Sequence, residues 1–84
     1  MGDAGRAREL THLSVTRELE EAELLEAAEL VKRLVKIDRA AALWAYQAIR
    51  RTYIRRRKRR GHHLPLRSLE RTAKALIDKR FQLG

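Results

Sequence analysis

The sequence predicts an all-α fold, a small domain of three helices. Three observations support this: apolar residues recur at spacings of three and four, no Gly or Pro occurs between residues 14 and 60, and no alternating β-branched segment indicates a strand. The 84 residues suffice for one modest core. We expect one helical domain over residues 14–84, after a flexible lead-in over residues 1–13, which carry two glycines and no periodicity.

The first predicted helix covers residues 17–37 and begins after a cap at Ser14 or Thr16. Glutamates in its first turns complement the positive end of the helix dipole. Its apolar stripe is wide for a single helix contact, so we expect part of it to face a protein partner or a second copy of the chain. An aromatic residue of the next helix is expected to face the same partner. The expected protein-facing residues are Leu24, Ala28, Val31, Leu34, Val35 and Trp44.

Asp38 is the predicted break after this helix, because aspartate caps helix starts well and three alanines follow Arg39. A second helix would then run to Gly61, a natural helix end, and form a hairpin with the first. One unbroken rod over residues 14–60 is the alternative, and it would require an oligomer to bury its stripe. Pro65 suits the first turn of a third helix.

The charge is large and uneven. The chain has 20 Lys and Arg against 11 Asp and Glu, a net charge of +9. Residues 1–38 sum to −3 and residues 39–84 to +12, and six consecutive cations occupy residues 55–60. Adjacent like charges repel unless an anion neutralises them, and the arginine fork matches phosphate oxygens well. The second half of the chain is therefore predicted to bind a nucleic acid.

The predicted nucleic-acid contacts comprise the basic run, the cations before it, a histidine pair after it, and one face of the third helix. These residues are Arg50, Arg51, Arg55, Arg56, Arg57, Lys58, Arg59, Arg60, His62, His63, Arg67, Arg71 and Lys74. A solvated basic tail or a nuclear-localisation signal is the alternative interpretation of the run. Tyr46 and Tyr53 fit the core, whereas Trp44 lies off the main stripe and could stack on an unpaired base or dock on a protein.

Other classes of function lack the necessary residues. Without cysteine there is no disulfide, thiolate zinc site or thiol nucleophile. The adjacent His62 and His63 point in different directions on a helix or turn and His12 is the only other imidazole, so we expect no zinc site. No constellation activates water or a nucleophile, so we expect no enzyme activity, no cofactor and no metal. No apolar run approaches the ~20 residues that span a membrane, and no signal-peptide segment begins the chain. We expect a cytoplasmic protein.

Residues 23–67, ELLEAAELVKRLVKIDRAAALWAYQAIRRTYIRRRKRRGHHLPLR, run from an acidic, apolar helix to a Tyr- and Arg-bearing helix and a basic stretch with a proline. This order resembles the helical hairpin of the zinc-ribbon protein subunit of archaeal and eukaryotic ribonuclease P. The resemblance implies that Arg50, Arg51 and residues 55–60 face RNA and that residues 24–35 face a partner protein. The zinc ribbon of that family is missing, because the chain has no cysteine, and a third helix takes its place.

The expected function is that of a non-enzymatic RNA-binding structural subunit of a ribonucleoprotein, such as the ribosome or ribonuclease P. The rival class is a DNA-packaging protein, a nucleoid or viral nucleocapsid subunit that coats duplex DNA, with a helix-turn-helix as one form of the contact. The third helix offers few side-chain amides for reading bases, which favours phosphate contacts. A peripheral membrane protein is disfavoured, because no bulky apolar face adjoins the basic run.

Overall fold

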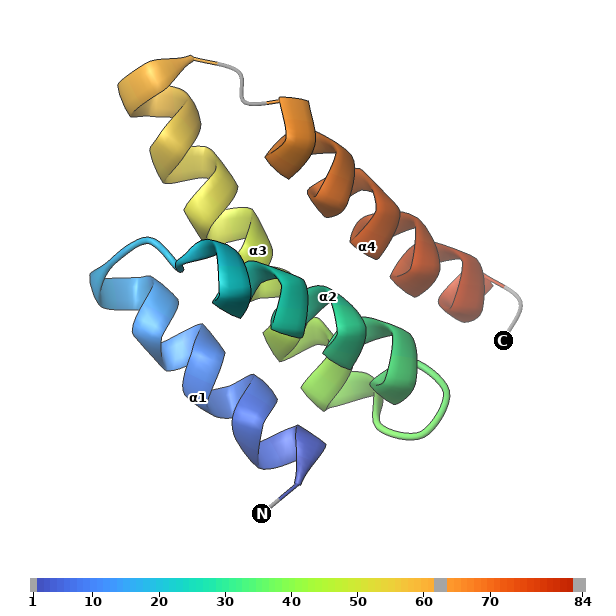
Figure 1. Cartoon of the computed structure of the whole chain (residues 1–84). Coiled ribbons are helices and arrows are strands. Elements are labelled where there is room, and N and C mark those ends of the chain that lie inside the picture. Colours follow the sequence, from blue (N-terminus) through green and yellow to red (C-terminus); the bar gives the residue numbers. More distant parts are fainter. Residues whose placement is uncertain (1, 62–63, 83–84) are drawn as a thin grey trace.

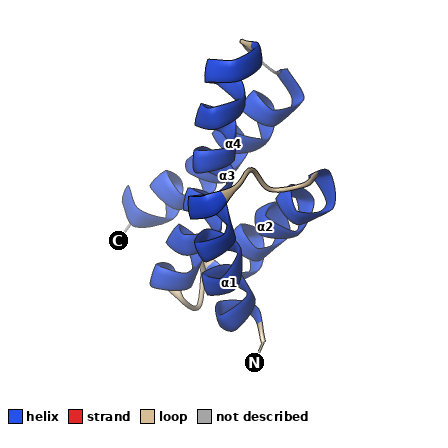
Figure 2. Cartoon of the chain, turned by 90° about the vertical axis from the view of Figure 1, so that its left-hand side faces the viewer, coloured by secondary structure: helices blue, strands red, loops and turns tan. Residues whose placement is uncertain are grey.

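A computed structural model of the chain describes residues 2–61 and 64–82, and within these residues it contains four helices and no strand. They are α1 (Asp3–Thr16), α2 (Glu21–Leu34), α3 (Arg39–Arg60) and α4 (Leu64–Gln82). α3 is the central helix: α1, α2 and α4 all pack against it, and α2 also contacts α1 and α4 (Figure 1). The connections between the described helices are short (Figure 2). The predicted all-α class is confirmed.

The helix α1 corrects two expectations, the count of three helices and the flexible lead-in over residues 1–13. Ala7 and Leu10 of α1 are fully buried, and the polar residues Thr11 and Ser14 complete its buried face. Half of this stripe is polar and small, so it does not stand out as an apolar pattern. Ser14 and Thr16 accordingly lie at the end of α1 and do not cap α2.

The α2–α3 hairpin is confirmed, and the alternative of one long rod is wrong. α2 begins with a capping box in which Glu20 and Glu23 each accept a hydrogen bond from the other's backbone N–H. After α2, residues 35–37 form a turn, and the Asp38 side chain accepts a hydrogen bond from the N–H of Ala41 at 3.1 Å. This cap starts a new helix in a new direction, as its aspartate predicted.

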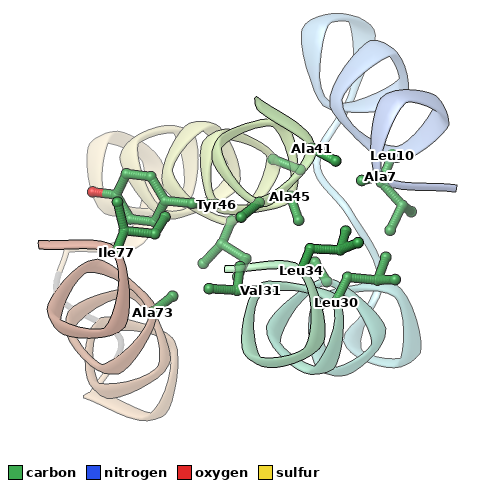
Figure 3. Close-up of a cluster of buried hydrophobic side chains, with 14 of the residues drawn as sticks. Ala7, Leu10, Leu30, Val31, Leu34, Ala41, Ala45, Tyr46, Ala73 and Ile77 are labelled. Carbon is green, nitrogen blue, oxygen red and sulfur yellow. The ribbon is translucent and has the colours of Figure 1, made fainter. Parts of the chain in front are cut away.

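The core lies where α2, α3 and α4 meet and extends between α1 and α3 (Figure 3). α3 contributes four fully buried alanines, Ala41, Ala42, Ala45 and Ala48. Because these side chains are small, neighbouring helices can approach α3 closely on several sides. Tyr46 lies between α3 and α4 beside Ile77 in the same view.

The core also corrects the predicted protein-facing surface. Leu24, Val31, Leu34 and Val35 are buried in the chain's own core, at 7 % exposure or less, and so cannot face a partner. The additional helix explains why the prediction failed: α1, α3 and α4 all pack against α2 and together cover most of the wide apolar stripe of α2. Ala28 and Trp44 are only half-buried and retain exposed surface.

The α3–α4 connection follows the predicted signals. Gly61 has φ 79°, in the left-handed region that favours glycine, and its N–H donates to the carbonyl of Arg57 at 2.9 Å. Pro65 is the second residue of α4, where its missing N–H costs no helix hydrogen bond. None of the helices formed by the described residues has the length and apolar character needed to cross a lipid bilayer.

Candidate nucleic-acid interface

The basic segment at the end of α3 is not a uniform patch. A helix turns by about 100° per residue, so consecutive cations point in different directions. Four arginines contact α1 and the α1–α2 connection: Arg51, Arg55, Arg56 and Arg59. Arg57 and Lys58 are exposed. We call the first four residues the inward arginines.

Arg51 and Arg55 bind the C-terminal end of α1. Arg51 Nη1 donates to the Thr11 hydroxyl at 2.8 Å and to the Thr11 carbonyl at 3.3 Å, and Arg55 donates to the carbonyl of Val15. Val15 lies in the last turn of α1, where carbonyls lack partners within the helix and carry the negative end of its dipole. Arg55 therefore completes the end of α1, and Arg51 attaches the buried side of α1 to α3.

Arg56 and Arg59 share the carboxylate of Glu18, in the α1–α2 connection. Arg59 Nη2 lies 2.7 Å from Glu18 Oε2, and Arg56 Nε lies 3.3 Å from Oε1, while Arg56 also pairs with Glu21 at 3.0 Å. The Arg56 side chain is only 12 % exposed. Burial alone would raise the pKa of Glu18, but hydrogen bonds from Arg59 and Arg56 outweigh it and lower this pKa.

Two further contacts hold the same connection. The N–H of Leu19 donates to the Thr52 hydroxyl at 3.0 Å, and both residues are fully buried. Arg17 donates two hydrogen bonds of 2.9 Å to Glu23, and together with the Glu20 N–H this lowers the pKa of Glu23 to about 2. Arg56 and Arg59 thus neutralise acidic residues of this chain, whereas Arg51 and Arg55 bind backbone and hydroxyl oxygens of α1. The sequence interpretation assigned all four to a nucleic acid, because the two carboxylate partners are 35–41 residues away.

The other cations of α3 are placed differently. Arg57 and Lys58 are exposed, and no carboxylate of the described residues pairs with either. Arg50, also exposed, lies near the Tyr46 hydroxyl, whose hydrogen bond raises the pKa of Arg50. The predicted contacts of His62, His63 and the Arg60 side chain lie outside the described residues.

α4 presents the second group of outward cations. Leu66, Ala73 and Ile77 are buried, whereas Arg71 and Lys74 are exposed and Arg67 is half-exposed. An open hollow of about 330 Å³ is lined by Arg67, Ser68, Arg71 and Thr72, two guanidinium groups and two hydroxyls. All four side chains can donate hydrogen bonds to a phosphate. We call Arg57, Lys58, Arg67, Arg71 and Lys74 the outward cations.

Behind this face, Tyr46 and Glu70 form a buried contact between α3 and α4. The Tyr46 hydroxyl donates to Glu70 Oε2 at 2.6 Å, and Glu70 is 8 % exposed. Burial raises the pKa of Tyr46, and the hydrogen bond to Glu70 raises it further. Because Glu70 is buried, this carboxylate, one of only two after residue 38, is turned away from solvent.

A second hollow, of about 430 Å³, lies between α1 and α3 and includes Trp44, Gln47 and Arg51 from α3. Arg8 and His12 of α1 line it too. Sequence reasoning missed both residues because they fall in the segment taken for a lead-in, and no local pattern connects them with Trp44. Among the described residues, no group of three His, Cys, Asp or Glu side chains is placed to hold a metal ion.

Comparison with known protein families, with curated proteins and with solved structures finds no match for this chain. The resemblance of residues 23–67 to the ribonuclease P subunit therefore stays a prediction.

Proposed function

We propose that this protein is a non-enzymatic RNA-binding structural subunit of a ribonucleoprotein, acting in the cytoplasm. One observation carries the proposal: the outward cations have no carboxylate partner among the described residues, whereas Arg56 and Arg59 do. The charges of the outward cations are therefore available to an external polyanion. Binding a phosphate backbone would neutralise them and release counterions, which drives association.

The spacing of the α4 cations supports contact with a phosphate backbone. Arg67 and Arg71 are separated by one helical turn and flank the hydroxyls of Ser68 and Thr72. Arg57 and Lys58 lie in the last turn of α3, and only residues 61–63 separate α3 from α4, so both groups belong to one end of the molecule (Figure 1). A strand crossing this end would meet cations from two helices.

Duplex DNA is the second candidate ligand. α4 packs on α2 and α3 through one face and leaves the face with Arg67, Arg71 and Lys74 open, as a helix entering a DNA groove requires. Base reading in the major groove relies on Asn and Gln amides and on arginine forks, and Gln82 is the only amide side chain of α4. This composition favours backbone contacts over sequence reading.

The proposed assembly includes a protein contact, which the resemblance to the ribonuclease P subunit implies. Of the residues first expected to face such a partner, Ala28 and Trp44 remain partly exposed. The first experiment nevertheless concerns the nucleic acid. The full chain should be titrated against a labelled RNA hairpin and competed with duplex DNA of equal length at several salt concentrations.

An RNA-binding subunit should prefer the hairpin and lose affinity steeply as salt rises. Equal or stronger competition by duplex DNA would favour the packaging function instead. Affinity that does not change with salt would contradict both candidates, because neither could then rest on phosphate neutralisation.

A pair of matched double variants locates the contact. Arg57→Gln with Lys58→Gln should weaken RNA binding and reduce the salt slope by about two. Lys32→Gln with Lys36→Gln removes the same charge near the α2–α3 turn, at the other end of α3, and should change both quantities much less. If the two double variants behave alike, net charge and not the outward cations would account for binding.

A further inference from the structure

The hollow between α1 and α3 combines an aromatic ring with cations. Trp44 is half-buried and packs against the core, and it is the only tryptophan of the chain. The side chains of Arg8, His12, Gln47 and Arg51 line the hollow with it. No carboxylate is among the lining residues, although acidic side chains are common elsewhere on α1 and α2.

The two arginines of the hollow differ in their freedom. Arg51 is held by its hydrogen bonds to Thr11, so its position is fixed before any ligand arrives. Arg8 is exposed and has no ion pair among the described residues, unlike Arg6, which binds Glu9 and Glu26. Gln47 is exposed and carries both a donor and an acceptor. The hollow therefore offers a flat apolar surface, positive charge and an amide.

We propose that this hollow binds one unpaired nucleotide of an RNA strand. The base stacks on Trp44, the Gln47 amide contacts the base edge, and Arg8 contacts the adjoining phosphate. A nucleotide is a ligand that joins a planar ring to an anion, and a base can leave its stack readily only where the strand is unpaired. The inference rests on the proposed RNA-binding function and adds a subsite apart from the outward cations.

The unique tryptophan makes the site directly observable. Indole fluorescence should be quenched when the full chain is titrated with a single-stranded 12-nucleotide RNA, and a fully paired RNA duplex of the same length should quench it far less. Anisotropy of labelled RNA, measured in parallel, reports binding at any site. The two signals together separate this inference from the proposed function.

Three variants complete the test. Trp44→Leu should lower the affinity for the single strand about tenfold, since base–aromatic stacking has that effect or more, and Trp44→Phe should retain most of it. Arg8→Gln should weaken binding of the single strand and leave the helical circular dichroism unchanged, because Arg8 is exposed and forms no ion pair with the residues that the structure describes. Lys36→Gln, at an exposed residue that does not line the hollow, is the charge-matched control.

The outcomes are distinct. Quenching by the single strand, together with a lower affinity measured by anisotropy in Trp44→Leu and Arg8→Gln, supports the subsite. Binding by anisotropy without quenching, or without any effect of the variants, overturns the subsite and leaves the proposed function standing. Absence of RNA binding overturns both. Equal quenching by a mononucleotide, or by a Glu-rich peptide, would overturn the inference by assigning the hollow to a free nucleotide or to a protein.

Discussion

Arg59 donates two hydrogen bonds to Glu18, from Nε at 3.1 Å and from Nη2 at 2.7 Å, although 41 residues separate them. Glu18 here occupies the position that a phosphate was expected to take. The carboxylate resembles a phosphate oxygen in charge and in its geometry toward a guanidinium group. The connection between α1 and α2 thereby sets how much positive charge α3 presents to an external ligand.

Replacing Glu18 with glutamine should therefore act on stability and on binding in opposite directions. Glu18→Gln weakens the contacts with Arg56 and Arg59, and we expect unfolding to become easier by about 1 kcal/mol, since the pair is partly exposed. The released guanidinium charge should increase RNA affinity. Urea unfolding and anisotropy titration measure the two effects. Glu29→Gln, at the exposed pair with Lys32, is the control and should change stability little.

Arg51 and Arg57 should separate structural from binding roles. Arg51→Gln removes the contacts that hold the end of α1, so we expect a loss of about 1–2 kcal/mol in unfolding free energy. Arg57 is exposed and has no ion pair within residues 2–61 and 64–82, so Arg57→Gln should leave stability within about 0.5 kcal/mol and reduce RNA affinity. A large stability loss in Arg57→Gln would mean that this cation has an internal role as well.

The buried Tyr46–Glu70 contact should contribute to stability and to its dependence on alkaline pH. Tyr46→Phe leaves the Glu70 carboxylate without its donor and should cost about 2 kcal/mol in thermal or urea unfolding. Tyr53→Phe removes the hydroxyl of a half-buried tyrosine with no hydrogen bond among the described residues and is the matched control. Equal losses in both variants would show that the contact with Glu70 has no special weight.

The same tyrosine predicts the alkaline behaviour. The pKa of Tyr46 is raised above its ordinary 10.0 by burial and by Glu70, so the folded state favours the neutral phenol. Its stabilisation is fully present below pH 10 and is lost as pH rises through the raised pKa. The difference in unfolding free energy between wild type and Tyr46→Phe should therefore shrink from pH 8 to pH 10 and pH 11. A difference that stays constant over this range would show that ionisation of Tyr46 is not coupled to folding.

Acid should unfold the protein through its arginine-bound glutamates. The pKa of Glu23 is lowered from 4.5 to about 2, chiefly by hydrogen bonds from Arg17 and from the Glu20 N–H. Its contribution is present above pH 4.5 and is lost as pH falls towards 2. Urea unfolding at pH 7, 4 and 2.5 should show the free energy of unfolding falling with pH, and in Glu23→Gln this free energy should fall less steeply. Asp78→Asn, at an exposed carboxylate of α4, should leave the slope unchanged.

Helix α1 should be a necessary part of the core. Leu10 is fully buried, so Leu10→Ala should lower the unfolding free energy by about 2–4 kcal/mol. Val15, on the same helix, is 54 % exposed, and Val15→Ala should have a small effect. If Leu10→Ala were as mild as Val15→Ala, this segment would behave as the flexible lead-in that the sequence alone suggested for residues 1–13.

The features that the sequence could predict are local ones. Apolar residues at helical spacing identify the buried sides of α2 and α4, Asp38 marks the start of α3, and Gly61 with Pro65 marks its end. Capping and periodicity act over a few residues, so the sequence displays them directly. The uneven charge, −3 before residue 39 and +12 after it, likewise requires no structure.

Tertiary structure alone decided that residues 3–16 form a helix, because small and polar residues such as Thr11 and Ser14 are buried only through partners on α3. It also decided which cations stay free, since Arg59 finds Glu18 across 41 residues, whereas Lys58 beside it faces solvent. A run of like charges fixes the sign of the surface potential. The direction of each side chain and the neighbours it meets depend on how the helices pack, and no short-range pattern records that packing.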